Sequence, residues 1–148
     1  MITPVKMEDS RLWILDQSLL PGQEHYIELR TKEEIWAAIK KLQVRGAPAI
    51  GVAAAYGLYR AVRDLESPNF QDFARDFHWA KEYIATARPT AVNLFWALER
   101  MEERLYQLRE QADAETPWEE QRAFIKEGLF QEADAIRRED EQSCLAMG

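Results

Sequence analysis

The segment at residues 44–51 reads Val-Arg-Gly-Ala-Pro-Ala-Ile-Gly and combines three features suited to binding an anion. Pro48 is well placed at a first helical position and pushes Ala47 toward an extended conformation, so a helix should begin sharply here. A helix start exposes unpaired N–H groups and a partial positive charge. Arg45 adds a full charge and a fork of donors that matches phosphate oxygens, while Gly46 allows a tight turn. The sequence therefore predicts a phosphate-binding helix start.

The same segment has an alternative interpretation, because small residues dominate the predicted helix. They leave room for a neighbouring element to approach closely, and they are Gly51, Ala53, Ala54, Ala55 and Gly57. On this interpretation the helix is a packing element that binds no ligand.

A second arginine has the same placement ahead of a predicted helix. Arg88 precedes Pro89, and the short polar side chains of Thr90 and Asn93 follow near the same end. Two such helix starts could hold one ligand between them, with Arg88 contacting phosphate or sugar hydroxyls. The alternative is that Arg88 forms only a surface ion pair, which contributes about 0–1 kcal/mol.

Other reactive residue types lack partners in the sequence. Cys144 is the single cysteine, so it forms no internal disulfide, and it has no metal-ligand spacing with His25 or His78. No neighbouring residue suggests an activated thiolate at Cys144. Both histidines are interpreted as packed or solvated side chains, and no metal site is predicted.

The length and net charge of the chain exclude some classes of function. A chain of 148 residues with 47% hydrophobic residues is ordinarily one domain with a substantial core. The net charge of -7 argues against nucleic-acid binding, which depends on clustered lysine and arginine. No segment resembles a signal peptide or a membrane span. We expect a soluble cytoplasmic protein.

Two short β-rich runs lie near the N-terminus, at residues 11–15 and 25–29, and a Leu-Pro-Gly turn signal separates them. They predict a β-hairpin over about residues 11–30. After it the hydrophobic period becomes helical, and Thr31 with Glu34 three residues later forms a capping-box pattern.

Further helix starts and apolar stripes occupy the rest of the chain. Helices are predicted from Thr31 to near Gln43, from Pro48 to about Asp64, from a cap at Ser67–Pro68, from Pro89, and from a second capping box at Thr116. Apolar residues recur at helical spacing in the third and fourth: Phe70, Phe73, Phe77, Ala80 and Ile84, then Leu94, Leu98, Met101, Leu105 and Leu108. The predicted fold class is mainly α (α+β), with a small N-terminal β-hairpin followed by a bundle of about five helices over residues 32–147, in one domain.

Several blocks of the sequence resemble one known family. The Arg-Gly-Ala-Pro-Ala-Ile-Gly block looks like the signature of methylthioribose-1-phosphate isomerases, in a superfamily shared with translation-initiation exchange-factor regulatory subunits and ribose-1,5-bisphosphate isomerases. The likeness extends to further blocks: Ile14-Leu15-Asp16-Gln17, Leu20-Pro21, residues 87–94, Glu139-Asp140 and Met147-Gly148. Family members are more than twice as long, so the chain resembles their N-terminal part. The C-terminal nucleotide-fold-like catalytic domain is then absent from residues 1–148.

The resemblance also implies roles for individual residues. The substrate contacts of the family match Arg45, Gly46, Ala47 and Arg88. The catalytic cysteine of the family lies in a Thr-x-Cys-Asn block that this sequence does not contain, and the catalytic aspartate also lies downstream. No residue of this chain, Cys144 included, is therefore assigned a catalytic role. The resemblance implies no metal and no organic cofactor.

The activity implied by the resemblance is conversion of 5-methylthioribose 1-phosphate to 5-methylthioribulose 1-phosphate in methionine salvage. This aldose-to-ketose step proceeds through an enediolate or a hydride shift, and we expect the 148-residue chain alone to be inactive. The implied partners are a sugar-phosphate small molecule, the missing C-terminal domain and, at full length, a second copy in a homodimer. Nucleic acid and membranes are not expected partners.

Other functions remain open at this point. A related regulatory subunit would sense a sugar phosphate or take part in assembly without isomerising it, and a ribose-1,5-bisphosphate isomerase would act on a different sugar phosphate. The Ala-Pro-Ala-Ile-Gly continuation resembles the methylthioribose-1-phosphate isomerases more closely. A helical interaction module with no small-molecule site would leave Arg45 and Arg88 unexplained.

Overall fold

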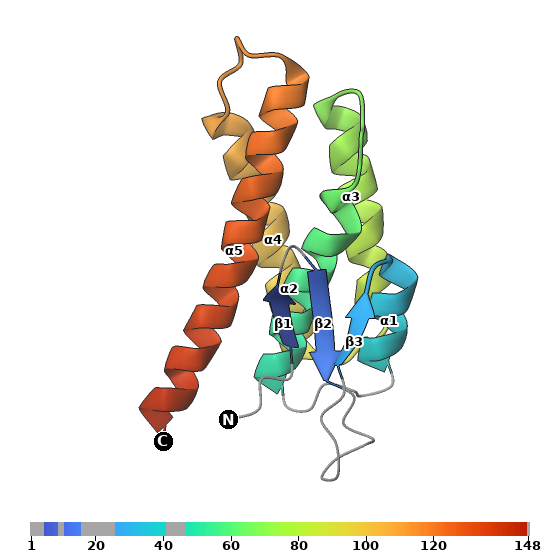
Figure 1. Ribbon diagram of the computed structural model, residues 1–148, viewed down its shortest axis with the longest axis vertical. Coiled ribbons are helices and arrows are strands. Elements are labelled where there is room, and N and C mark those ends of the chain that lie inside the picture. The colour runs from blue at the N-terminus through green and yellow to red at the C-terminus, as the bar shows by residue number, and fades with distance from the viewer. Residues whose placement is uncertain (1–4, 9–10, 16–25, 41–46, 148) are drawn as a thin grey trace.

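The computed structural model describes residues 5–8, 11–15, 26–40 and 47–147, and it contains a small sheet followed by helices (Figure 1). The elements in chain order are β1 (Val5–Glu8), β2 (Arg11–Leu15), β3 (Tyr26–Leu29), α1 (Lys32–Lys40), α2 (Ala47–Arg63), α3 (Phe70–Ala85), α4 (Val92–Gln111) and α5 (Trp118–Met147). The predicted fold class, mainly helical with strands at the N-terminus, is confirmed.

The predicted hairpin is part of a three-stranded antiparallel sheet in the order β1-β2-β3. Strands β2 and β3 form the expected pair, and β1 adds a strand on the other edge of β2. The sequence analysis missed β1 because four residues of alternating pattern are too short a signal. One face of the sheet is apolar and packs toward α2, and its buried side chains are Val5, Leu12, Ile14 and Leu29.

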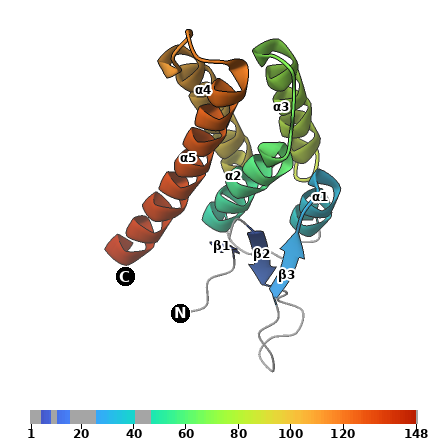
Figure 2. The same ribbon diagram turned by 45° about the horizontal axis from the view of Figure 1, so that its top comes forward.

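Helix α2 lies in the middle of the molecule and contacts the sheet and the four other helices (Figures 1 and 2). Residues 50–60 are all buried. Their small side chains allow close approach: a Cβ added at Gly57 would lie 2.6 Å from Cγ2 of Ile35 in α1. The close packing predicted from the small residues is therefore confirmed, and ligand binding at the helix start stays a prediction.

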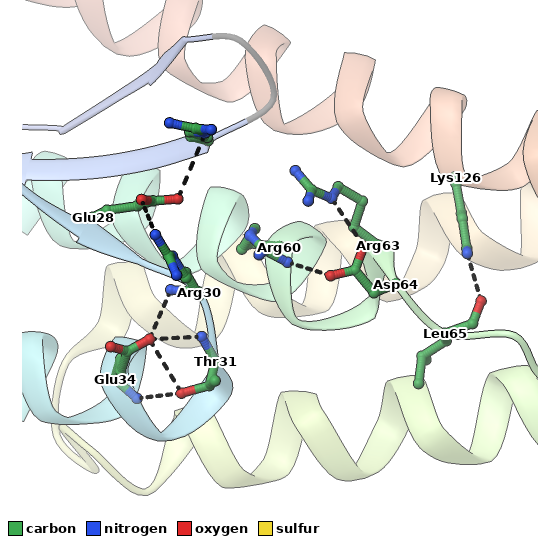
Figure 3. A network of polar contacts seen from close by, with 10 residues as sticks. Glu28, Arg30, Thr31, Glu34, Arg60, Arg63, Asp64, Leu65 and Lys126 are labelled. Atoms are coloured by element: carbon green, nitrogen blue, oxygen red, sulfur yellow. Dashed lines mark hydrogen bonds and ion pairs between the residues drawn. The ribbon is translucent and has the colours of Figure 1, made fainter.

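The predicted capping box at the start of α1 is confirmed. The Glu34 amide donates to the Thr31 hydroxyl oxygen at 3.1 Å, and the Glu34 carboxylate accepts from the Thr31 amide, also at 3.1 Å (Figure 3). The Arg30 amide donates to the same carboxylate oxygen at 2.9 Å. Local side chains thus satisfy backbone N–H groups at the start of α1, which is why the sequence pattern alone predicted this cap.

The predicted cap of α3 is wrong by two residues. Asn69, not Ser67, is the N-cap, and its side-chain oxygen accepts from the Asp72 amide at 2.8 Å. The Ser67 backbone carbonyl instead accepts from the Trp118 indole at 2.7 Å and from Arg122 at 2.9 Å. Ser67, which the local pattern assigned to capping α3, therefore contacts α5 through its backbone carbonyl.

The predicted starts of α4 and α5 also need correction. Helix α4 begins at Val92 rather than Pro89, because a chain of turns occupies residues 86–90. At the start of α5 the Thr116 hydroxyl donates to the Asp113 carbonyl at 2.7 Å instead of capping the helix. The apolar stripes of α3 and α4 are nevertheless buried as predicted, with Phe70 only partly so.

Charged side chains hold α5 along the bundle. Arg100 of α4 donates to Glu132 at 2.6 Å and to Glu139 at 2.6 Å, two turns apart on α5. Tyr56 of α2 donates to Asp134 at 2.8 Å and accepts from Arg137 at 2.9 Å. Burial, together with the hydrogen bond to the Asp134 carboxylate, raises the pKa of the Tyr56 hydroxyl far above its ordinary value.

The C-terminal end of α2 is also fixed by polar contacts (Figure 3). Arg60 donates to Asp64 at 2.9 Å, and the Lys126 ammonium of α5 donates to the Leu65 carbonyl just beyond the helix. The Lys126 bond satisfies a backbone carbonyl in the segment that joins α2 to α3. None of the described helices combines the length and the hydrophobicity that a membrane-spanning segment requires.

We predict that Gly128→Ala destabilises the fold although alanine favours helices. A Cβ at residue 128 would lie 2.6 Å from Cδ1 of the buried Leu108 and would overlap its other methyl group. Overpacking costs about 1–3 kcal/mol, whereas glycine to alanine in a helix gains about 1 kcal/mol. Urea denaturation should therefore show a net loss.

The control is the same change beside a smaller neighbour. In a Leu108→Ala background the overlap disappears, so Gly128→Ala should stabilise the chain by up to about 1 kcal/mol. Equal effects of Gly128→Ala in both backgrounds would contradict the close-packing explanation.

Candidate anion-binding site at two helix starts

Helices α2 and α4 run in the same direction, and both begin at the lower end of the bundle (Figures 1 and 2). Their first turns are in contact: a Cβ added at Gly51 would lie 3.2 Å from the Asn93 carbonyl oxygen and 3.8 Å from Cβ of Ala97. Because glycine occupies residue 51, the two helix starts lie side by side. Their unpaired N–H groups are therefore presented at the same end of the molecule.

The first turns of α2 and α4 share a charge pattern that the other helices lack. Neither contains an acidic residue, whereas the first turns of the other three do: Glu33 and Glu34 in α1, Asp72 in α3, and Glu119 and Glu120 in α5. An acidic residue in the first turn offsets the positive end of a helix dipole. This offset is missing at the two adjacent starts, so this end favours an external anion.

Arg88 lies in the turn that leads into α4. The turn is fixed by backbone bonds, from the Ala87 amide to the Ile84 carbonyl and from the Ala91 amide to the Arg88 carbonyl, both at 3.0 Å. Ala87 is buried, so the backbone beside Arg88 is anchored in the core. The sequence predicted a helix start at Pro89. The structure has an anchored turn at that place, and α4 follows it from Val92.

The Arg88 side chain is partly buried, and its Nη1 atom has no hydrogen-bond partner among the described residues. Arg60 Nε is similarly unpartnered, but Arg60 is held by Asp64 through its Nη1 atom. Within the described part of the chain, no ion pair of Arg88 is found, and the surface ion-pair interpretation stays open for the other residues. An unsatisfied buried donor costs about 1–3 kcal/mol, and an anionic ligand would remove that cost.

The other predicted site residues are placed as follows. Ala47 is the first residue of α2, next to the start that the motif predicted. Arg45 and Gly46 fall in residues 41–46, outside the described part of the chain. Thr90 is exposed and Asn93 is partly buried beside the α2 start. The assignment of Arg45, Gly46, Ala47 and Arg88 as substrate contacts stays a prediction.

The remaining reactive side chains lie apart from these helix starts or outside the described residues. His78 is half exposed, with its Nδ1 atom 3.0 Å from Glu102 and its Nε2 atom 3.5 Å from Glu82. His25 lies outside the described residues, and so does the side chain of Cys144. Among the side chains that are described, no three metal-ligating residues come together.

Glu102 also pairs with Lys81, at 2.8 Å between the carboxylate and the ammonium. Burial raises the pKa of the Glu102 carboxyl, but hydrogen bonds from Lys81 and His78 outweigh it and the net shift is downward. The carboxylate is therefore ionised and serves as a cross-link between α3 and α4. The position of His78 is therefore explained by its contact with Glu102, without any role in acid–base catalysis.

One contact beside Arg88 was not anticipated from the sequence. The Trp36 indole of α1 donates to the Thr86 hydroxyl at 2.9 Å, and that hydroxyl donates to the Tyr83 carbonyl at 2.6 Å. Fifty residues separate Trp36 from Thr86. No local pattern reports a bond over that separation, so only the folded structure could reveal it.

Two named relatives are similar over nearly the whole chain. A methylthioribose-1-phosphate isomerase of Symbiobacterium thermophilum is 49% identical, over 99% of this chain and 39% of the relative. A 5-deoxyribose 1-phosphate isomerase of Petrotoga mobilis is 46% identical, over 99% of this chain and 40% of the relative. The chain thus spans about two-fifths of the length of the curated relatives that it matches.

Two solved structures share the fold. The 5-methylthioribose 1-phosphate isomerase of Pyrococcus horikoshii OT3 superposes with a TM-score of 0.78 at 34% identity, over 94% of this chain and 36% of that one. The translation initiation factor eIF-2B subunit delta of A. fulgidus gives a TM-score of 0.79 at 34% identity, over 94% and 37%. These likenesses agree with the resemblance drawn from the motifs.

The family comparison covers the site as well as the helices around it. The Initiation factor 2 subunit family matches residues 43–148, which include the start of α2, the Arg88 turn and the start of α4. The chain belongs to the Initiation factor 2 subunit family.

Proposed function

We propose that this chain is the N-terminal, substrate-binding domain of an isomerase that converts 5-methylthioribose 1-phosphate to 5-methylthioribulose 1-phosphate. The observation that carries the proposal is the pair of adjacent helix starts without acidic first turns, together with Arg88 in the turn before α4, whose Nη1 atom has no partner among the described residues. A phosphate is the ligand class that such donors recognise best. The names of the similar proteins support a sugar 1-phosphate.

In the proposed reaction the C1–O4 ring bond breaks and the hydrogen on C2 moves to C1. The proton of the C2 hydroxyl ends on O4, and a carbonyl remains at C2, so the atoms balance. The phosphate on C1 prevents simple opening to a free aldehyde, which makes its firm positioning important. Arg45, the α2 start and Arg88 would hold the phosphate and orient the sugar.

The acid–base chemistry is proposed to come from a second, nucleotide-fold-like domain. Binding groups without a proton or hydride acceptor position a substrate but do not convert it. We further propose a homodimer of the complete protein in the cytoplasm, with no metal or organic cofactor. Closure of the second domain over the phosphate would strengthen these contacts by excluding water.

Two other functions have specific support. Relatives named 5-deoxyribose 1-phosphate isomerase suggest a substrate that differs only at C5, far from the phosphate that this domain would hold. The likeness to an eIF-2B delta subunit suggests a role in assembly or in sensing a sugar phosphate without turnover. Activity assays with both sugars would separate these cases, because only an isomerase forms a ketose.

We predict that Arg88→Ala weakens binding of 5-methylthioribose 1-phosphate to this chain about ten- to hundredfold, because a charge-assisted hydrogen bond contributes about 1.5–3 kcal/mol. Arg45→Ala should act similarly, and Arg45→Lys should only partly restore binding because a point charge does not reproduce the guanidinium fork. NMR titration measures the dissociation constants, and thermal melts report stability separately.

Arg75→Ala is the matched control for this titration. Arg75 is an exposed α3 arginine paired with Asp72 at 3.3 Å, away from the two helix starts. Its loss should leave the dissociation constant unchanged. If Arg88→Ala and Arg45→Ala bound the sugar phosphate as tightly as the Arg75→Ala control, the proposed anion site would be wrong.

We also predict that the 148-residue chain forms no detectable ketose from 5-methylthioribose 1-phosphate. A coupled or NMR-detected turnover assay on the purified chain checks this, with circular dichroism confirming that the helices are formed. Measurable turnover would place an acid–base group within residues 1–148 and would contradict the proposed division between two domains.

A further inference from the structure

A side-chain relay ties the turn that carries Arg88 to α1. The Trp36 indole N–H donates to the Thr86 hydroxyl oxygen at 2.9 Å, and the same hydroxyl donates to the Tyr83 carbonyl at 2.6 Å. Thr86 is the C-cap of α3 and lies two residues before Arg88. The hydroxyl thus accepts one bond and donates another, and it joins α1 to the end of α3.

The backbone between Thr86 and Arg88 has little freedom to absorb movement. The Thr86 amide bonds to the Glu82 and Tyr83 carbonyls, and the Ala87 amide bonds to the Ile84 carbonyl. Ala87 is also buried. A shift of the Thr86 hydroxyl is therefore passed to the Arg88 backbone.

Trp36 is itself held in place by its surroundings. Its ring lies 6.1 Å from the Tyr83 ring, measured between centroids, and the Lys40 ammonium lies 6.0 Å from the Trp36 ring. On the neighbouring residue of α1, Ile35 packs against Gly57 of the central helix. Contacts of α1 with α2 and α3 therefore determine the position of the indole N–H.

We propose that Trp36 is a positioning residue for the sugar-phosphate site: through Thr86 it sets the turn that presents the Arg88 guanidinium at the starts of α2 and α4. This inference rests on the proposed function, because it assigns Trp36 to the same binding site. Trp36 itself touches no ligand. Its effect is to reduce the ordering that Arg88 must undergo when the phosphate binds.

The competing explanation is that Trp36 only stabilises the fold. Trp118 provides a matched control, because its indole N–H also bonds to a loop, at 2.7 Å to the Ser67 carbonyl. That bond lies at the other end of α3, away from Arg88 (Figure 1). Replacing either tryptophan by phenylalanine removes an indole donor while keeping an aromatic ring.

The experiment compares Trp36→Phe, Thr86→Val and Trp118→Phe with the parent chain. Thermal melts and NMR titration with 5-methylthioribose 1-phosphate are measured for each. All three changes should lower the melting temperature. The dissociation constant should rise about two- to tenfold for Trp36→Phe and Thr86→Val but stay unchanged for Trp118→Phe. The double variant Trp36→Phe with Thr86→Val should bind no more weakly than the weaker-binding of these two single variants, because both changes break the same relay.

A second readout uses the ligand-free chain. Exchange of the Ala87 and Ala91 amide protons should become faster in Trp36→Phe, and the Arg88 Nε–H signal should shift, with neither change in Trp118→Phe. Equal effects of the two tryptophan changes on these signals and on binding would overturn the positioning role. Absence of sugar-phosphate binding by the parent chain would instead overturn the proposed function, while the ligand-free signals would still decide whether Trp36 holds Arg88.

Discussion

The burial of α2 on every side is the constraint on which the rest of this structure depends. A helix that is apolar all round must be enclosed, and its small residues determine how near each neighbour can come. Gly57 admits Ile35 of α1, and Gly51 admits the first turn of α4. The sheet closes another side with the apolar face that contains Leu12 and Ile14. Close packing and the candidate site are therefore two results of the same residues.

Parallel packing of α2 and α4 has an electrostatic cost, because it brings two partially positive helix ends together. The chain does not offset that cost with acidic first turns, and it adds Arg88 to the same end. The two helix starts and Arg88 thus place positive partial and full charges at one end of a protein whose net charge is -7. The phosphate binding proposed above would offset the electrostatic cost of this arrangement.

Sequence reasoning succeeded where the structural cause is local. The Thr31–Glu34 capping box and the buried stripe that contains Phe73 follow from spacing alone, and so does the position of the α2 start. It failed at Ser67, whose hydroxyl donates to Asp76 at 3.3 Å instead of capping the helix, so that Asn69 caps α3. For the candidate site, the sequence singled out Arg88 from its place before a proline, and its role in binding stays a prediction. The neighbouring α2 and α4 starts and the Trp36 relay are tertiary contacts without any local signal.

The enclosure of α2 also has a consequence for how the chain folds. The Tyr56–Asp134 hydrogen bond joins residues 78 positions apart, so α2 is covered on that side only when α5 returns to it. Contacts at such separation incur a large loop-closure entropy before they are formed. Until then the helix keeps an apolar surface open to water and to other chains. The return of α5 to α2 is thus the step that covers this apolar surface.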